Sequence, residues 1–395
     1  MEPTLKVLHL GKFFPPGVGG IESFLKELCI GLSDHSVKNI VLAHTHDPKS
    51  KQNYEQHLST KNGKTIKIFR AKSYGDFFFV PISPSFPLLL HRLLKTERPD
   101  VIHIHMPNLS AFWLLLINTK KDTSWVIHWH SDVLASKHNW KLRLFYPIYK
   151  LFEQALLKRT DSIIVTSQAY LNNSAALKGW HRKCDVIQLG INPENIPLSC
   201  ESLPSALPFW PDDKLRVLTI GRLTYYKGFE ILINAVCNLP NISVIIIGEG
   251  LMREKLKRLI TNNGISHRVF LAGYVSDSEK SYYLDNCNCF CLPSYEKTEA
   301  FGMVLLEAMS FSKALIACSI KGSGVPWIIR DKVTGYLAEP ESTKSMQNTL
   351  KAVSVNAAVL KEMGAKGNKD LHERFLIDLV AFKIVTLYKK TLVSR

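Results

Sequence analysis

The sequence SYEKTEAFGMVLLEAM occupies positions 294–309 and is the most informative stretch of this chain. It follows an apolar run at 287–292 that predicts a strand, so Glu299 lies in the loop after that strand and Glu307 inside the helix that comes next. A strand, loop and helix in this order are the unit of a parallel α/β sheet. We expect the free amides of the first helical turn to form an anion site between the two acids, at Ala300, Phe301, Gly302 and Met303.

The two carboxylates and these amides suit a ligand that carries sugar hydroxyls beside a phosphate. Two glutamates near a helix N-terminus are also found as ordinary surface residues that favour the helix dipole. Other motifs of the chain are therefore needed to choose between the two interpretations.

Strands and helices alternate from end to end, which predicts α/β architecture with parallel sheets. A proline-rich stretch at 193–213 has neither helical nor strand periodicity and is typical of a linker. We expect a Rossmann-like domain at 1–192, a second one at 214–374, and a final helix within 375–395. The predicted strands lie at 5–10, 39–43, 101–105, 125–128, 162–166, 185–189, 216–220, 243–247, 268–271, 287–292 and 314–317.

Composition agrees with a two-domain enzyme. The chain has 395 residues, of which 46% are hydrophobic, and a mean hydropathy near zero. Its longest apolar runs are shorter than the roughly 20 residues that span a bilayer. The N-terminus shows no signal-peptide pattern, so we expect a cytoplasmic protein.

The net charge of +16 favours an anionic surface or a polyanionic substrate, although a merely soluble basic surface would carry it as well. The residues before 200 are the more basic half. They contain an aromatic, proline-broken segment at 74–86 that is either a buried strand and turn or a contact with the cytoplasmic leaflet. No basic segment is interleaved with aromatics as in nucleic-acid-binding modules, so no nucleic acid is expected as a partner.

A second motif, GRLTYYKG, occupies 221–228. Together with the Glu299 and Glu307 pair it resembles the retaining nucleotide-sugar glycosyltransferases of family 4, and the likeness covers nearly the whole chain. The resemblance implies the GT-B fold, with two facing Rossmann-like domains and a C-terminal helix that crosses back to the first. It also implies that Glu307 holds the nucleotide ribose, that Glu299 contacts hydroxyls of the transferred sugar, and that Arg222 and Lys227 bind the diphosphate.

The first loop of the chain reads GKFFPPGVGGIE at 11–22 and leads into a helix near Gly20. Gly19 and Gly20 allow backbone amides to approach an anion closely, although a purely structural turn would also use them. The loop lacks a G-x-G-x-x-G pattern and a ribose-binding acid, which argues against a dehydrogenase. Similar loops in the resembled family close over the diphosphate or the acceptor.

Histidines gather at the predicted strand ends. His103 and His105 are expected to be core residues, whereas His130 ends its strand and resembles the family histidine that reaches the donor sugar. Asp132 is either a partner of an acceptor hydroxyl or the cap of a turn. In the second half, Gly248 is expected near the nucleotide, and Tyr274 follows a strand where its ring could meet the base.

No metal site and no cofactor are expected. The Asp-x-Asp signature of metal-dependent transferases has no credible match, and Arg222 with Lys227 would take the place of the ion. Cys287, Cys289 and Cys291 alternate on one predicted strand without a fourth ligand, which indicates buried thiols.

The resemblance therefore implies a retaining hexosyltransferase of cell-surface polysaccharide or lipopolysaccharide synthesis. A nucleoside-diphosphate sugar would be the donor, with mannose favoured, and a glycan or lipid-linked glycan the acceptor. Two alternatives share the fold, namely a nucleotide-sugar 2-epimerase and a noncatalytic sugar-nucleotide binding protein.

Overall fold

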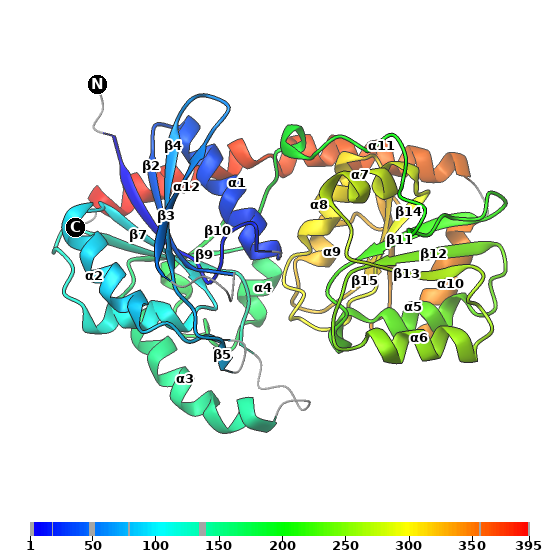
Figure 1. Cartoon of the computed structure of the whole chain (residues 1–395), viewed down its shortest axis with the longest axis horizontal. Coiled ribbons are helices and arrows are strands. Elements are labelled where there is room, and N and C mark those ends of the chain that lie inside the picture. The colour runs from blue at the N-terminus through cyan, green and yellow to red at the C-terminus, as the bar shows by residue number, and fades with distance from the viewer. Residues whose placement is uncertain are drawn as a thin grey trace. The chain divides into compact units, whose positions relative to one another are not determined.

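The computed structural model describes residues 4–17, 19–46, 52–77, 80–133, 140–354 and 357–393. These form two compact units (Figure 1). The first runs up to Gly190 and resumes at Ile377, and the second spans Ile191–Leu376. The stretch predicted as a linker, 193–213, lies within the second unit.

The first unit is built on an eight-stranded sheet of order β10-β9-β8-β7-β1-β2-β4-β3. All neighbours in it are parallel except β3 and β4. Its strands are β1 Lys6–Leu10, β2 Lys38–His44, β3 Tyr54–Ser59, β4 Thr65–Ala71, β7 Val101–Met106, β8 Ser124–Trp129, β9 Ser162–Val165 and β10 Cys184–Val186.

Helices cover both faces of this sheet, which explains why its central strands β7 and β8 are buried along their whole length. On one face, Leu25 and Cys29 of α1 pack with Val41 and Ala43 of β2. On the other, Phe86 of α2 stacks on His44. The helices are α1 Gly20–Asp34, α2 Ser85–Thr96, the 3-10 helix η1 Leu109–Leu116, α3 Trp140–Arg159, α4 Gln168–Asn173 and α12 Ile377–Val393.

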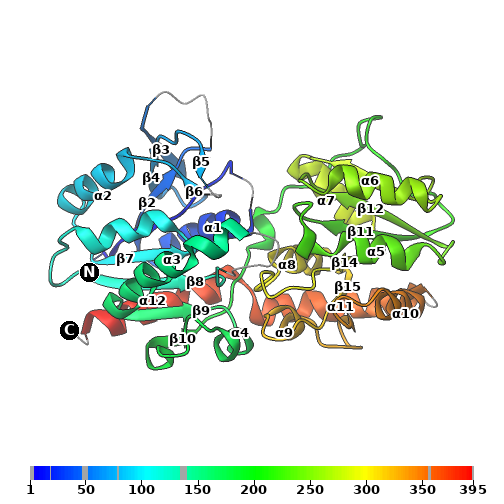
Figure 2. The same ribbon diagram turned by 90° about the horizontal axis from the view of Figure 1, so that it is seen from below.

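The second unit has a six-stranded parallel sheet of order β13-β12-β11-β14-β15-β16 (Figure 2). Its strands are β11 Leu215–Ile220, β12 Ile242–Ile247, β13 Val269–Gly273, β14 Cys289–Leu292, β15 Ala314–Cys318 and β16 Gly335–Ala338. Its helices are α5 Phe229–Val236, α6 Arg253–Asn262, α7 Asp277–Asn286, α8 Met303–Ser310, α9 Val325–Ile328, α10 Thr343–Ser354 and α11 Ala357–Arg374. The α/β prediction with two Rossmann-like domains is thus confirmed.

The last helix, α12, belongs to the first unit although the chain reaches it only after the second. It packs so closely on α1 that a Cβ added at Gly31 would lie 3.3 Å from the Cβ of Ala381. The predicted crossing helix therefore exists, but it begins at Ile377 and is preceded by another helix, α11.

Some boundaries differ from the prediction for local reasons. Cys287 caps α7 and precedes β14, so it does not share a strand with Cys289 and Cys291, although all three thiols are buried. The hairpin of β3 and β4 was missed because β3 is an exposed, polar edge strand.

The aromatic segment at 74–86 falls partly outside the described residues, which omit 78 and 79. Short antiparallel strands β5 Asp76–Phe77 and β6 Val80–Pro81 flank that gap. Phe86 is buried, whereas Tyr74 and Ile82 are exposed. Among the described residues, no helix combines the length and apolarity that crossing a bilayer requires.

Candidate active site

Loops at the carboxyl ends of three neighbouring strands interlock in the second unit. Gly228 has a φ of 69°, and a Cβ there would lie 2.0 Å from the carbonyl oxygen of Pro293. Gly248 has a φ of 138°, and its Cβ would lie 2.0 Å from the carbonyl oxygen of Gly221. Only glycine fits both the backbone angle and the space at these positions. The loops after β11, β12 and β14 therefore meet at the edge of the sheet where parallel sheets bind ligands.

Lys227 and Glu299 form the central contact of these loops. Lys227 is the last residue of the 3-10 helix η4 Tyr225–Lys227, and its Nζ lies 2.5 Å from Oε2 of Glu299. The hydroxyl of Ser294 donates to the same oxygen at 2.9 Å. Burial lowers the pKa of Lys227, but the Glu299 carboxylate outweighs it and leaves the pKa above its ordinary value, so Lys227 is charged.

Arg222 lies near this pair but is exposed. The two positive charges repel each other, so the Arg222 guanidinium acts to lower the pKa of Lys227. The structure thus brings together two cations and one carboxylate of the predicted site, and both cations stand on the loop after β11.

Glu307 lies on α8, as predicted, and its Oε2 lies 3.1 Å from Nζ of Lys280 on α7. Asp277 also contacts Lys280, at 3.4 Å. Burial lowers the pKa of Lys280, and the two carboxylates, Glu307 first, outweigh it and raise the pKa above its ordinary value. Lys280 thus holds Glu307 in place, a role that nothing in its sequence context indicated.

The predicted start of α8 was wrong by three residues. Gly302 is the N-cap, with a φ of 88°, and this left-handed backbone separates Ala300 and Phe301 from the helix. Both are buried, and the carbonyl oxygen of Ala300 accepts from the Gly324 amide at 2.7 Å. The helix N-terminus therefore lies at Gly302 and Met303. Tyr274 follows β13 at the same edge of the sheet and is 71% exposed.

In the first unit the loop after β1 leads into α1. Gly19 is the N-cap in extended conformation, and Gly20 is the first helical residue. A Cβ at Gly19 would lie 2.1 Å from Oε2 of Glu22, which is the end of a flexible side chain, so the Glu22 carboxylate would have to move for a larger residue. The N-terminus of α1 thus lies at the carboxyl end of β1, as predicted.

His130 directly follows β8 and is 4% exposed. Its backbone amide donates to the carbonyl oxygen of Met106 at 3.0 Å, and its ring stacks on that of His128 at 4.4 Å. Burial lowers the pKa of His130 to about 3, so its imidazole is neutral.

Asp132 is buried and bound within its own unit. It accepts from the indole of Trp129 at 2.9 Å and from the hydroxyl of Ser174 at 2.6 Å. These contacts hold the turn after β8 in place. An acceptor-binding role for Asp132 remains a prediction.

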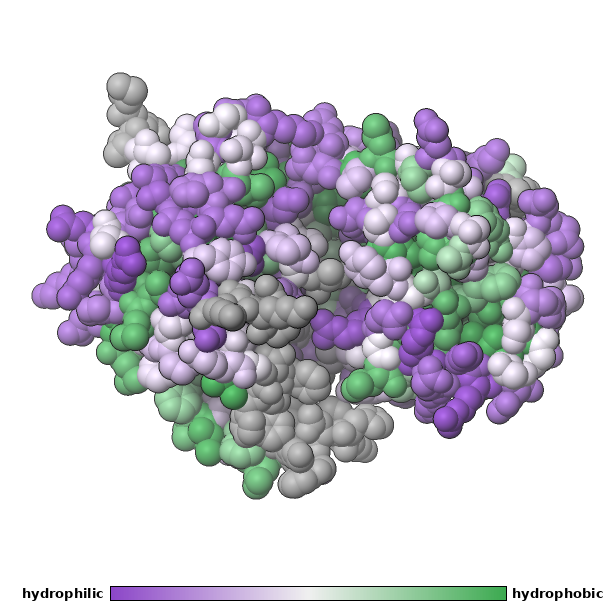
Figure 3. All heavy atoms as spheres, in the orientation of Figure 1, coloured by the Kyte–Doolittle hydropathy of each residue, from purple (hydrophilic) through white to green (hydrophobic). Residues whose placement is uncertain are grey.

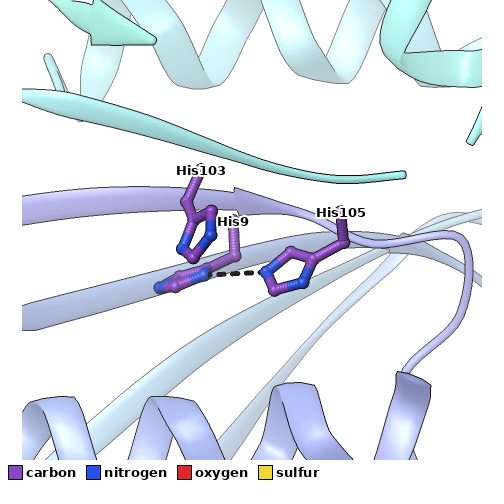
Figure 4. Close-up of side chains that lie close together, drawn as sticks. All are labelled: His9, His103 and His105. Atoms are coloured by element: carbon purple, nitrogen blue, oxygen red, sulfur yellow. Dashed lines mark hydrogen bonds between the residues drawn. The ribbon is translucent and has the colours of Figure 1, made fainter. Parts of the chain in front are cut away.

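His130 is one of five buried histidines on a single face of the sheet, with His9, His103, His105 and His128. The expected core burial of His103 and His105 is confirmed. The strand register brings the rings together, because His9 pairs with His103 and His105 pairs with His128 on neighbouring parallel strands. Within each of two triplets, the ring nitrogens lie within 4.8 Å of one another. The first triplet is His9, His103 and His105, which Figure 4 shows, and the second is His105, His128 and His130.

Sequence reasoning also missed Glu153, which lies buried on α3. Burial raises its pKa to about 7, the phenol of Tyr149 lowers it, and Asp132 adds to the increase. In the sequence, a single acid in an otherwise basic helix does not indicate that its carboxyl group is buried.

Two family models match successive parts of the chain. Glycosyltransferase Family 4 matches residues 18–195, and Glycosyl transferases group 1 matches residues 207–370. The O-antigen chain mannosyltransferase C of Escherichia coli is 26% identical over 99% of this chain and 100% of its own length.

Solved structures agree on the fold. Sucrose-phosphate synthase from Thermosynechococcus elongatus superposes with a TM-score of 0.80 at 20% identity, covering 99% of this chain and 100% of that one. Anabaena HepE in complex with UDP-glucose superposes with a TM-score of 0.71 at 17% identity, covering 99% and 100%.

Proposed function

The chain belongs to the glycosyltransferases of group 1 and family 4 and has their GT-B fold, and from this premise we propose which transfer it performs. It moves a hexose, with retention, from a nucleoside-diphosphate sugar to a hydroxyl of a glycan or lipid-linked glycan. The product belongs to cell-surface polysaccharide or lipopolysaccharide. The E. coli mannosyltransferase supports this assignment and favours mannose, whereas the UDP-glucose complex of HepE keeps a UDP-sugar as the next candidate.

The observation that carries the proposal is the contact of Lys227 with Glu299 beside Arg222. Negative charge grows on the diphosphate as the glycosidic bond breaks, and fixed cations stabilise it most at that moment. Lys227 and Arg222 supply that field, so the reaction needs no metal ion. Glu299, oriented by Ser294 and Lys227, is placed to accept hydrogen bonds from hydroxyls of the sugar.

Retention follows from attack on the face that the diphosphate leaves. The acceptor hydroxyl forms the new bond to the anomeric carbon, and its proton passes to the departing phosphate oxygen. This step needs no covalent sugar–enzyme intermediate. The cations that neutralise the diphosphate also orient it during the step.

A panel of nucleotides tests the proposal. The correct nucleoside diphosphate, out of UDP, GDP and dTDP, should raise the melting temperature of the full chain most, because a ligand stabilises by an amount set by its concentration over Kd. GDP-mannose turnover should then require an acceptor. Epimerised sugar without an acceptor would favour the 2-epimerase, and binding without any turnover would favour the noncatalytic protein.

Glu307→Gln should weaken binding of the nucleoside diphosphate by about 1.5 to 3 kcal/mol, because a charge-assisted hydrogen bond to the ribose is lost. Isothermal titration of wild type and variant measures this difference. Glu254→Gln, an exposed glutamate on α6 of the same unit, is the matched control and should bind as wild type does. Equal affinity of Glu307→Gln and wild type would remove the ribose assignment.

We also propose a contact with an anionic membrane surface and place it on α3, whereas the role suggested for the segment at 74–86 falls partly outside the described residues and stays a prediction. Among the side chains of α3 that the structure describes, five large apolar ones are exposed, Leu144, Phe145, Ile148, Leu151 and Phe152, as are Trp113 and Leu116 of η1. Figure 3 shows apolar atoms along the lower edge of the first unit, where α3 lies in Figure 1. The described side chains of α3 include four exposed cations, Arg143, Lys150, Lys158 and Arg159, and its one acid, Glu153, is buried. A basic helix with this apolar face fits an anionic leaflet.

Leu144→Ser/Leu151→Ser should therefore reduce cosedimentation with liposomes that contain anionic lipid, at low salt. Leu251→Ser, which changes a leucine that is 91% exposed in the second unit, is the control and should sediment as wild type does. Recovery of wild-type protein in the supernatant, with and without anionic lipid, would leave a transferase that acts without this surface.

A further inference from the structure

Three of the five buried histidines form a continuous hydrogen-bonded chain that ends at Asn39 on β2. Nε2 of His130 lies 3.0 Å from Nδ1 of His105. Nε2 of His105 in turn lies 3.3 Å from Nδ1 of His9, the contact that is dashed in Figure 4. Nε2 of His9 then lies 3.0 Å from Oδ1 of Asn39. Every ring in this chain is at most 4% exposed, so solvent does not compete for these contacts.

The amide of Asn39 can have only one orientation. Its Nδ2 contacts the carbonyl oxygens of Cys29, at 3.0 Å, and Val37, at 3.3 Å. Carbonyl oxygens only accept hydrogen bonds, so the NH₂ group must point at them. The remaining atom, Oδ1, therefore faces His9 and accepts from it.

This orientation sets the proton position in each ring in turn. His9 must carry its proton on Nε2, and because a neutral imidazole holds one proton, its Nδ1 is bare. His105 then donates from Nε2 to that bare nitrogen, and its own Nδ1 is bare. His130 donates from Nε2 to His105, which leaves Nδ1 of His130 bare as well. Burial keeps the pKa of His9 at about 4 and that of His105 well below the ordinary value, as neutrality requires.

We propose that Asn39 sets the tautomer of His130 through His9 and His105, so that His130 meets a substrate hydroxyl with a bare Nδ1 that can only accept. Nδ1 of His130 is buried and has no hydrogen-bond partner among the described residues. A buried acceptor without a partner is costly, and a bound hydroxyl would satisfy it. The relay itself is independent of catalysis, whereas the role of Nδ1 toward a hydroxyl rests on the proposed function.

A metal ion in the same cluster is the competing occupant. His9, His103 and His105 have the spacing of three ligands, and the phenol of Tyr388 contacts Nδ1 of His103 at 2.6 Å, as an outer partner of a ligand would. Two findings favour the relay. The nitrogens of His9, His105 and His130 lie at donor–acceptor distances, and no carboxylate among the described side chains has a recorded contact with these rings that would offset a buried divalent charge.

Nitrogen-15 NMR of the full chain labelled at histidine tests the relay, because protonated and bare ring nitrogens resonate far apart. The signals of His130 are assigned by their loss in His130→Gln. We expect a protonated Nε2 and a bare Nδ1 in wild type. A protonated Nδ1, or rapid exchange between the two tautomers, would overturn the proposal without any variant.

Asn39→Leu removes the fixed acceptor and should convert His130 to a mixture of tautomers, with a severalfold fall in kcat and unchanged affinity for the nucleotide. Tyr388→Phe removes a buried contact of His103 outside the relay and should leave the His130 signals as they are. If Asn39→Leu does not fold, His105→Phe interrupts the relay at its middle and has the same readout.

Retention of the wild-type tautomer in folded Asn39→Leu would overturn the relay. A changed tautomer with unchanged kcat would overturn its link to transfer while the relay stands. If wild type transfers no sugar at all, the proposed function fails and the NMR spectrum still decides the relay. About one equivalent of tightly bound metal in wild type, lost in His103→Ala, would replace the relay by a metal site.

Discussion

Lys227→Ala should lower kcat for sugar transfer by about 10²-fold or more, with a smaller effect on affinity for the donor. The lysine neutralises charge that grows on the diphosphate in the transition state, and such contacts act on turnover more than on binding. Arg222→Ala should act in the same direction. Steady-state kinetics on the donor identified by the nucleotide panel measures both effects.

The structure also predicts that Lys227→Ala is less stable than wild type, so the stability of the variant must be measured alongside its activity. Removing Lys227 leaves Glu299 with little solvent and with Ser294 as its recorded hydrogen-bond donor, so the melting temperature should fall as well. Lys255→Ala, which breaks an exposed pair with Glu230 in the same unit, is the control and should keep its activity. Turnover within twofold of wild type in both Lys227→Ala and Arg222→Ala would place the diphosphate elsewhere.

The same cations underlie the proposed metal independence. Transfer by wild type should continue in excess EDTA. Loss of activity on chelation, with recovery on adding Mg²⁺ or Mn²⁺, would contradict the role given to Lys227 and Arg222.

His130→Ala should lose transfer activity by a factor on the order of 10², because a group that positions the substrate is missing. His128→Ala is a matched control, since it removes a ring of equal burial two residues earlier on the same face. Both variants leave a cavity and should lower the melting temperature to a similar degree. Activity per folded molecule should fall only in His130→Ala. Equal activity in both would make His130 a core residue like its neighbour.

Much of the architecture could be predicted from the sequence because the buried parallel strands are apolar runs of five or six residues, such as Ile242–Ile247. The exposed edge strand Tyr54–Ser59 has no such pattern and was missed. The start of α8 could not be predicted, because the left-handed turn at Gly302 depends on packing against Leu292 and Val325 from other elements.

The site was predictable where one loop carries two residues, as with Arg222 and Lys227. Contacts between different helices and strands could not be predicted. Lys280 reaches Glu307 across two helices, and the chain of rings from Asn39 to His130 depends on the register of neighbouring strands, which no local spacing encodes. In each case the histidine or the acid was visible in the sequence, but its partner was not.

The position of α12 bears on how the protein is synthesised. The ribosome makes the residues up to Gly190 before the second unit, yet α12, which packs on α1 and contains the buried Val380, Ile384 and Tyr388, is made after it. Until then the first unit lacks the buried apolar side chains that α12 contributes to it, whereas the second unit is formed by one continuous stretch of chain. We expect the second unit to acquire its native structure before the first, in reverse of the usual vectorial order. A fragment that stops at 376 should bind chaperones or aggregate.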